Sequence, residues 1–74
     1  MAVVAVYENE SSTVVYNDRG NQIYHYCRRH DSSSASGNTV LIDASECGGY
    51  MDLLVFDDDG RLIRESSLNP RPRR

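Results

Sequence analysis

The sequence has no lysine, no tryptophan and only two cysteines among its 74 residues. Cys27 and Cys47 are too few for a disulfide framework, and without a secretion signal we expect both thiols to stay reduced. No apolar run approaches the roughly 20 residues of a membrane span, and the apolar residues 2–7 are too few for a signal peptide. We therefore expect a soluble, cytoplasmic protein with no membrane partner.

Because lysine is absent, all eight basic residues are arginines. Three of them, Arg71, Arg73 and Arg74, lie in a proline-containing segment that predicts a disordered tail over residues 70–74. Residues 1–69, which we expect to form one small domain, carry five arginines against eleven acids, a net charge of −6. An acidic body repels phosphate backbones and attracts basic surfaces. The expected partner is therefore a larger protein with a basic surface rather than a nucleic acid.

The length of the chain also limits its chemistry. A domain of this size buries only about 60% of the surface that its unfolded chain exposes. Its thin core leaves little room for a deep pocket lined by catalytic groups. Since no catalytic or cofactor motif is present either, we predict a protein that is not an enzyme and binds no cofactor. Self-association is a natural way to bury more surface, so we expect a monomer or a homodimer.

The most distinctive feature is a segment that occurs twice, over residues 14–24 and 54–64. Each copy has a β-rich run, a polar tetrad that ends in glycine, and a second run with an aliphatic residue three places after that glycine. Asn or Asp at the first turn position can accept hydrogen bonds from the nearby backbone, and glycine at the fourth position tolerates a positive φ. Residues 17–20 and 57–60 therefore each predict a type I turn that closes a hairpin with a bulge.

Residues 16–23 and 56–63 are also similar to the Tyr-Asp repeats of large secreted shell proteins. The units of those repeats run through an aromatic residue, an acid, a glycine and an aliphatic residue. Such repeats work as long arrays, and two copies do not make a shell. The resemblance therefore implies no function for this chain.

Period-two patterns and turn residues predict an all-β fold. We expect about six short strands, over residues 2–7, 13–17, 21–29, 39–43, 50–56 and 61–66. The serine-rich residues 30–38 predict a mobile loop. Regular spacing of the turns favours a small antiparallel meander or barrel built around the two similar hairpins. The alternative is an α+β fold with one short helix between residues 30 and 48.

Neither candidate metal site has the required spacing. If Gly60 took the sixth position of a calcium loop, the first ligand would fall on Val55 and the bidentate glutamate on Ser66. A zinc site would need a set whose spacing lacks the paired ligands of structural sites: His25, Cys27, His30 and Cys47. We therefore predict no metal site, and we expect Cys27 in the core and His25 at its rim.

The second turn has more acids than its geometry requires. A type I turn needs one Asn or Asp at its first position, but residues 57–59 are all aspartates, whereas the first turn is nearly neutral. The predicted partner-binding acidic face comprises Asp52, Asp57, Asp58, Asp59 and Glu65. In size and charge the chain resembles small acidic inhibitors from phages and mobile elements, including anti-CRISPR proteins that imitate nucleic acid. This resemblance implies a small inhibitor that binds the basic surface of a larger protein.

Two alternative functions follow from other residues. Alternation places Tyr24, Tyr26 and Arg28 on one strand face, followed by Arg29, and such a face can stack and neutralise single-stranded nucleic acid. The other alternative is a structural module whose edge strand, residues 2–7, pairs with a second copy of the chain.

Overall fold

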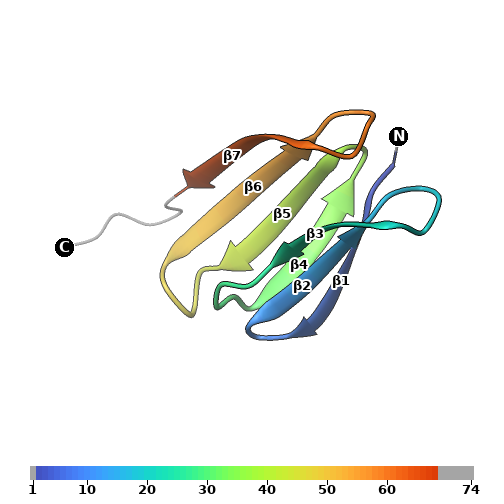
Figure 1. Cartoon of the computed structure of the whole chain (residues 1–74). Helices are drawn as coiled ribbons and strands as arrows, with labels where there is room; N and C mark the ends of the chain where they lie inside the picture. The colour runs from blue at the N-terminus through green and yellow to red at the C-terminus, as the bar shows by residue number, and fades with distance from the viewer. Residues whose placement is uncertain (1, 69–74) are drawn as a thin grey trace.

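The computed structural model describes residues 2–68 and shows two antiparallel β-sheets, without a helix in this part of the chain (Figure 1). The first sheet has the strand order β1-β2-β3 and the second β4-β5-β6-β7, so each sheet is a meander of consecutive strands. The strands of the first sheet are β1 (Val4–Asn9), β2 (Ser12–Tyr16) and β3 (Gln22–Tyr26). Those of the second are β4 (Ser32–Ser36), β5 (Thr39–Ala44), β6 (Tyr50–Phe56) and β7 (Leu62–Leu68).

The two sheets pack their inner faces against each other. Alternate residues of β5 and β6 are buried, as expected for strands with one face on a core. Both sheets contribute to one hydrophobic cluster: Val3, Val15, Tyr26, Val40, Ile42, Leu54 and Phe56. The sandwich therefore has a single shared core.

The segment that follows β3 connects the two sheets across one end of this core. The backbone N–H of His30 donates to the carbonyl of Glu10 (2.8 Å), and that of Asp31 donates to the carbonyl of Asp43 (2.7 Å). One hydrogen bond reaches the first sheet and the next reaches the second. The crossing is thus fixed by backbone pairing rather than by packing alone.

The all-β prediction is confirmed, and the sheets have the predicted antiparallel meander order. Of the alternatives, the barrel is not formed because the sheets are open, and residues 30–48 contain no helix. The described residues hold seven strands rather than six, because Ser32–Ser36 forms β4 in the segment predicted as a loop. The small side chains of this edge strand are mostly exposed, so β4 is held mainly by its main-chain pairing with β5. Gly37, with φ +59°, and Asn38 form its two-residue hairpin turn, a recognised sequence signal for pairing.

The largest difference in strand boundaries is at the end of β3, which stops at Tyr26 rather than at the predicted residue 29, because the chain then crosses to the second sheet. The bounds of β1 also differ, since it begins at Val4 rather than at residue 2. β1 extends to Asn9, beyond the predicted end at residue 7, because a bulge shifts its pairing with β2. The side chain of Asn9 then accepts a hydrogen bond from the N–H of Ser11 (2.8 Å) in a short turn. Residue 69 and the predicted tail, residues 70–74, lie outside the described residues. No helix within residues 2–68 is long and apolar enough to cross a membrane.

Candidate functional site

The first predicted turn forms as its sequence indicates. The N–H of Gly20 donates to the carbonyl of Asn17 (3.1 Å), and Gly20 has φ +83°. The Oδ1 atom of Asn17 accepts hydrogen bonds from the N–H groups of Arg19 and Asn21, both at 2.9 Å. The register between β2 and β3 shifts beside this turn, as the predicted bulge requires. Local sequence therefore determines the shape of this hairpin end.

The second turn repeats the same contacts. The N–H of Gly60 donates to the carbonyl of Asp57 (3.0 Å), and Gly60 also has φ +83°. The Oδ1 atom of Asp57 accepts from the N–H groups of Asp59 and Arg61, both at 2.9 Å. The half-buried Asp57 is thus a structural residue of the turn, whereas the carboxylates of Asp58 and Asp59 exceed what the turn needs.

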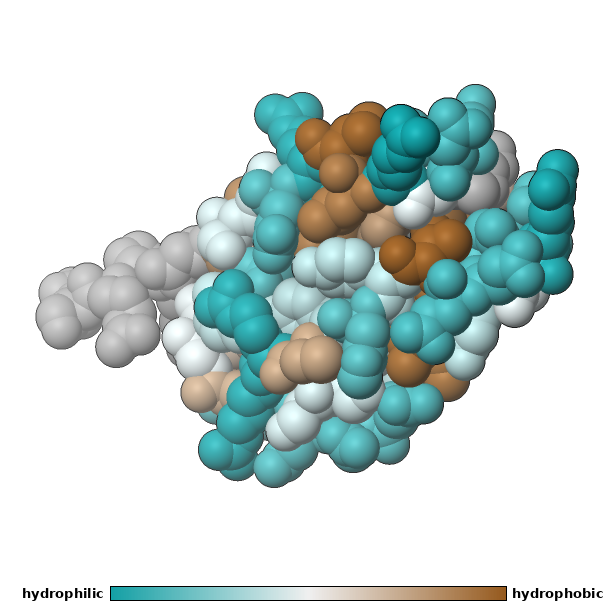
Figure 2. All heavy atoms as spheres, in the orientation of Figure 1, coloured by the Kyte–Doolittle hydropathy of each residue, from teal (hydrophilic) through white to brown (hydrophobic). Residues whose placement is uncertain are grey.

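The two turns lie at the same end of the sandwich, beside each other (Figure 1). Ile23, which follows the first turn, approaches the second so closely that a Cβ added to Gly60 would lie 3.0 Å from Ile23 Cγ2. Between the turns is a polar hollow of about 320 Å³. The residues that line it are Asn17, Asp18, Arg19, Asp58 and Asp59. We refer to these five residues as the acidic end, and hydrophilic residues, in teal, project at this end of the molecule in Figure 2.

Three carboxylates and one guanidinium line the hollow, so its lining carries a net negative charge. The side-chain amide of Asn38, in the turn between β4 and β5, donates to Asp58 Oδ1 (3.2 Å). This hydrogen bond lowers the pKa of the Asp58 carboxyl below its usual value. The sequence prediction missed Asp18 and Arg19, because only the packing of the two sheets brings the first turn beside the second.

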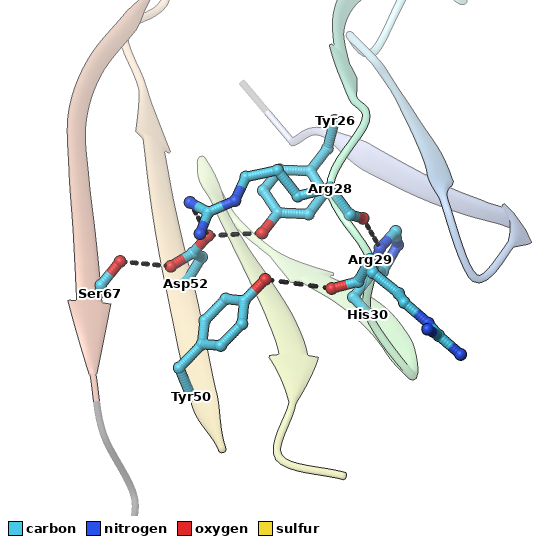
Figure 3. Close-up of polar contacts among 7 residues, drawn as sticks. All are labelled: Tyr26, Arg28, Arg29, His30, Tyr50, Asp52 and Ser67. Atoms are coloured by element: carbon cyan, nitrogen blue, oxygen red, sulfur yellow. Dashed lines mark hydrogen bonds and ion pairs between the residues drawn. The ribbon is translucent and has the colours of Figure 1, made fainter. Parts of the chain in front are cut away.

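Asp52, which we predicted on the exposed acidic face, is fully buried, so this part of the prediction is wrong. Its carboxylate lies between the sheets (Figure 3). Oδ2 accepts from the Tyr26 hydroxyl at 2.5 Å, and Oδ1 accepts from the Ser67 hydroxyl at 2.6 Å. Arg28 Nη1 lies 3.4 Å from Oδ2. These partners offset the cost of burying the carboxylate, and they link the end of β3 to β6 and β7.

The predicted acidic face is therefore only partly assembled. Asp58 and Asp59 line the hollow, Asp57 holds the turn, and Glu65 is exposed on β7 without lining the hollow. The burial of Asp52 was detectable in the sequence. Strand alternation places it in the same row as the apolar residues at positions 54 and 56, which face the core.

The predicted nucleic-acid face does not present its tyrosines. Tyr26 is 2% exposed, and the half-buried Tyr24 packs edge-on against Phe56, with ring centroids 5.8 Å apart. Burial raises the pKa of Tyr26 above its usual value, and the hydrogen bond to Asp52 raises it further. Burial likewise raises the pKa of Tyr24, with a smaller contribution from Glu65. Both rings pack against the core, and Tyr26 has almost no exposed surface on which a base could stack.

The two arginines of that face are exposed but engaged. The guanidinium of Arg28 lies over the ring of Tyr50, 5.1 Å from its centroid. The Tyr50 hydroxyl donates to the carbonyl of Arg29 (3.0 Å), and Arg29 Nη2 lies 3.6 Å from Glu10 Oε1. Figure 3 shows the hydrogen bond from Tyr50 to Arg29, and Arg28 beside Asp52 and its partners. Tyr50 was absent from the predicted residues because it enters from a different strand.

The four candidate zinc ligands serve separate local roles. His30 is fully buried, with Nε2 2.6 Å from Thr13 Oγ1 and Nδ1 2.6 Å from the carbonyl of Arg28. The exposed His25 contacts a serine hydroxyl on β2. Cys27 and Cys47 are free and exposed, so the expectation of Cys27 in the core is wrong. Residues 2–68 contain no group of three or more His, Cys, Asp or Glu side chains placed to hold a metal ion.

Comparison with protein-family models, with curated proteins and with solved structures finds no match for this chain.

Proposed function

We propose that this protein is a non-enzymatic binding module that uses its acidic end to occupy a basic surface of a larger protein. The observation that supports the proposal is the hollow between the two turns, lined by the carboxylates of Asp18, Asp58 and Asp59. None of these three carboxylates is among the turn-closing acceptors, which are the side chains of Asn17 and Asp57. Their placement thus has no role in closing the hairpins.

The geometry of the acidic end suits recognition of arginine and lysine side chains. Each turn is held by four hydrogen bonds, so the carboxylates project from ordered backbone and lose little freedom on binding. Carboxylates accept charge-assisted hydrogen bonds from guanidinium groups. The guanidinium of Arg19 adds hydrogen-bond donors to the lining, and acceptors on the partner can pair with them. The acidic end thus offers complementary charge together with a fixed shape.

A narrower form of the proposal is an inhibitor from a phage or mobile element that presents carboxylates where its target expects phosphates. The acidic composition of the body supports it. This form predicts that a nucleic acid and this chain compete for the same surface of the partner. The alternative of a single-stranded nucleic-acid binder is weaker, because the two tyrosines of its predicted face pack against the core.

Charge reversal at the acidic end tests the proposal. The chain with Asp18→Arg and Asp59→Arg is immobilised beside the unchanged chain and incubated with lysate of the source cells. The control carries Glu8→Arg and Glu46→Arg, an equal change of charge at exposed positions that do not line the hollow. We expect proteins that the unchanged chain and the control both retain, that elute with salt, and that the Asp18/Asp59 variant does not retain. Retention of the same proteins by all three chains would contradict the proposal.

A further inference from the structure

The outer face of the four-stranded sheet consists of the side chains of β4–β7 that point away from the first sheet. Residues of β5 and β6 that point inward, such as Ile42 and Leu54, belong to the shared core. The residues that alternate with them point outward, and most of these are aliphatic rather than polar. The apolar residues of the outer face are Leu41, Met51, Leu53, Val55 and Leu68.

This composition is typical of strands that are covered on both faces. When one face of an antiparallel sheet lies in water, the residues of that face are usually polar. Within residues 2–68 the first sheet covers the inner face of β4–β7, and no further helix or strand lies over the outer one. Leu68 on this face is 49% exposed. A contiguous apolar surface of this kind marks an interaction site.

We propose that this outer face packs against the outer face of a second copy, so that two sandwiches join sheet on sheet. The inference does not rest on the proposed function, because its partner is the chain itself. Residues 1–69 carry a net charge of −6. Among the described strand residues, however, only Asp43 and Arg64 carry charge on the outer face. The face is therefore neutral on an acidic body, and two copies can meet there without repulsion at the contact.

The two charges lie symmetrically about Leu53. Asp43 pairs with Met51 on β6, and Arg64 pairs with Val55. Each charge thus lies one strand and two residues from Leu53, on opposite sides of it. A twofold axis can lie in the plane of the face, through Leu53 and at right angles to the line between the charges. It places Arg64 of each copy opposite Asp43 of the other.

The resulting interface has an apolar centre and paired charges. The strands of the two sheets cross steeply, which is one of the two arrangements that packed sheets adopt. Leu53 meets Leu53 of the second copy on the axis, and Leu41 comes near the second copy's Val55. Packed sheets are about 10 Å apart, a gap that an arginine and an aspartate span together. The N–H of Ser45 donates to Asp43 Oδ1 (2.9 Å), which orients that carboxylate. The outer face is therefore complementary to itself.

The size of the face predicts a weak dimer. Its four strands have five to seven residues each. With about 4.8 Å between strands and 3.4 Å per residue, the face covers roughly 20 Å by 20 Å. Two such faces bury on the order of 800–1,000 Å² in total, which is at the low end of specific interfaces. We therefore expect a dissociation constant on the order of 100 μM.

Isotope-filtered NMR locates the interface in the unchanged chain. A sample at millimolar concentration mixes ¹³C-labelled and unlabelled copies, and sedimentation equilibrium measures the dimer. We expect intermolecular NOEs between the methyl groups of Leu41, Leu53 and Val55. A chain that stays monomeric at this concentration would overturn the inference. Intermolecular NOEs confined to other surfaces, such as the exposed Val4 and Val6 of the first sheet, would overturn it as well.

Paired substitutions test the apolar centre. The chain with Leu41→Thr and Leu53→Thr keeps β-branched side chains that suit strands. The matched control carries Val4→Thr and Val6→Thr, on the outward side of the first sheet. We expect the first variant to raise the dissociation constant by about tenfold or more and the control by less than about twofold. Urea denaturation verifies that both chains fold, and equal dissociation constants for the two folded variants would contradict the inference.

A charge substitution tests the pairing without altering the apolar centre. Arg64→Glu places two acids opposite each other in the proposed dimer, whereas Arg61→Glu makes the same change of net charge at an exposed position before β7. Arg64→Glu should raise the dissociation constant about fivefold more than Arg61→Glu does. Equal effects of the two substitutions would refute the twofold arrangement about Leu53.

The two proposals fail separately. A monomeric chain that loses its retained proteins through Asp18→Arg and Asp59→Arg would overturn the dimer and support the proposed function. A dimer with NOEs on the outer face, whose retained proteins are indifferent to those substitutions, would do the reverse.

Discussion

The hydrogen bond between Tyr26 and Asp52 should contribute strongly to folding, because both groups are buried and they connect the two sheets. The Tyr26 hydroxyl lies 2.5 Å from Asp52 Oδ2, and the carboxylate has no exposed surface. Tyr26→Phe removes this donor and leaves the charge buried with fewer partners. Asp52→Asn keeps the shape of the side chain and removes the charge. The double variant removes the interaction from both sides.

The expected magnitudes follow from the burial of the pair. A hydrogen bond to a charged group contributes about 1.5–3 kcal/mol, so Tyr26→Phe should lower the free energy of unfolding by about 2 kcal/mol. A domain of this size has a total stability of roughly 4–11 kcal/mol, so this loss is a large fraction of it. It corresponds to a fall in Tm of about 8–16 °C. Arg28 should matter less, since its side chain is 59% exposed and solvent weakens the ion pair.

Urea denaturation of the unchanged chain, both single variants and the double variant gives the coupling energy directly. We expect the double variant to lose about 1.5–3 kcal/mol less than the sum of the two single losses. The slope of the unfolding free energy with urea should stay constant across the four chains. Additivity within about 0.5 kcal/mol would refute the reasoning, because it would mean that the two side chains do not stabilise each other.

Three other predictions concern the turns and the buried tyrosine. In urea denaturation, Asp57→Ala should lower the free energy of unfolding by about 1–2 kcal/mol and Asp59→Ala by less than about 0.5 kcal/mol. The reason is that only Asp57 accepts the backbone hydrogen bonds of the turn, so equal losses would argue against this role. Gly60→Ala should lower the Tm more than Gly20→Ala does. Both glycines have φ +83°, but only at Gly60 does the added methyl group meet a neighbouring side chain. Equal falls in Tm would contradict the close approach of the two turns. Burial raises the pKa of Tyr26 in the folded state, so above pH about 10 the unfolded state should lose the Tyr26 proton first. The free energy of unfolding should therefore hold below that pH and fall above it by up to about 1.4 kcal/mol per pH unit. An equally steep alkaline decline in a Tyr26→Phe chain would count against the raised pKa.

The parts of the fold that the sequence could predict are those with local causes. The contacts of Asn17 and Asp57 lie within five residues of each side chain, so their chemistry was readable from each tetrad alone. The predicted strand over residues 50–56 has the observed bounds of β6, because both of its rows are apolar enough to identify it. The serine-rich β4 has no comparable pattern, and its pairing comes from the main chain.

The candidate site depended on packing that no local pattern contains. Asp18 and Arg19 join the acidic end because the first turn comes beside the second, and this depends on how the two sheets pack. Tyr26 and Asp52 are 26 residues apart and meet only across the sandwich. Counting charges thus identified the acidic turn correctly as a surface feature but placed Asp52 on it, whereas the alternation of β6 puts Asp52 inside.

The role of the acidic end is tested most directly by amide chemical-shift mapping of the labelled chain with a nona-arginine peptide as the probe. We expect the largest shifts in the turns at residues 17–20 and 57–60, and we expect them to vanish in the chain with Asp18→Arg and Asp59→Arg. Shifts spread evenly over the surface, or shifts that persist at the turns of that variant, would contradict a specific basic-ligand site at this end of the molecule.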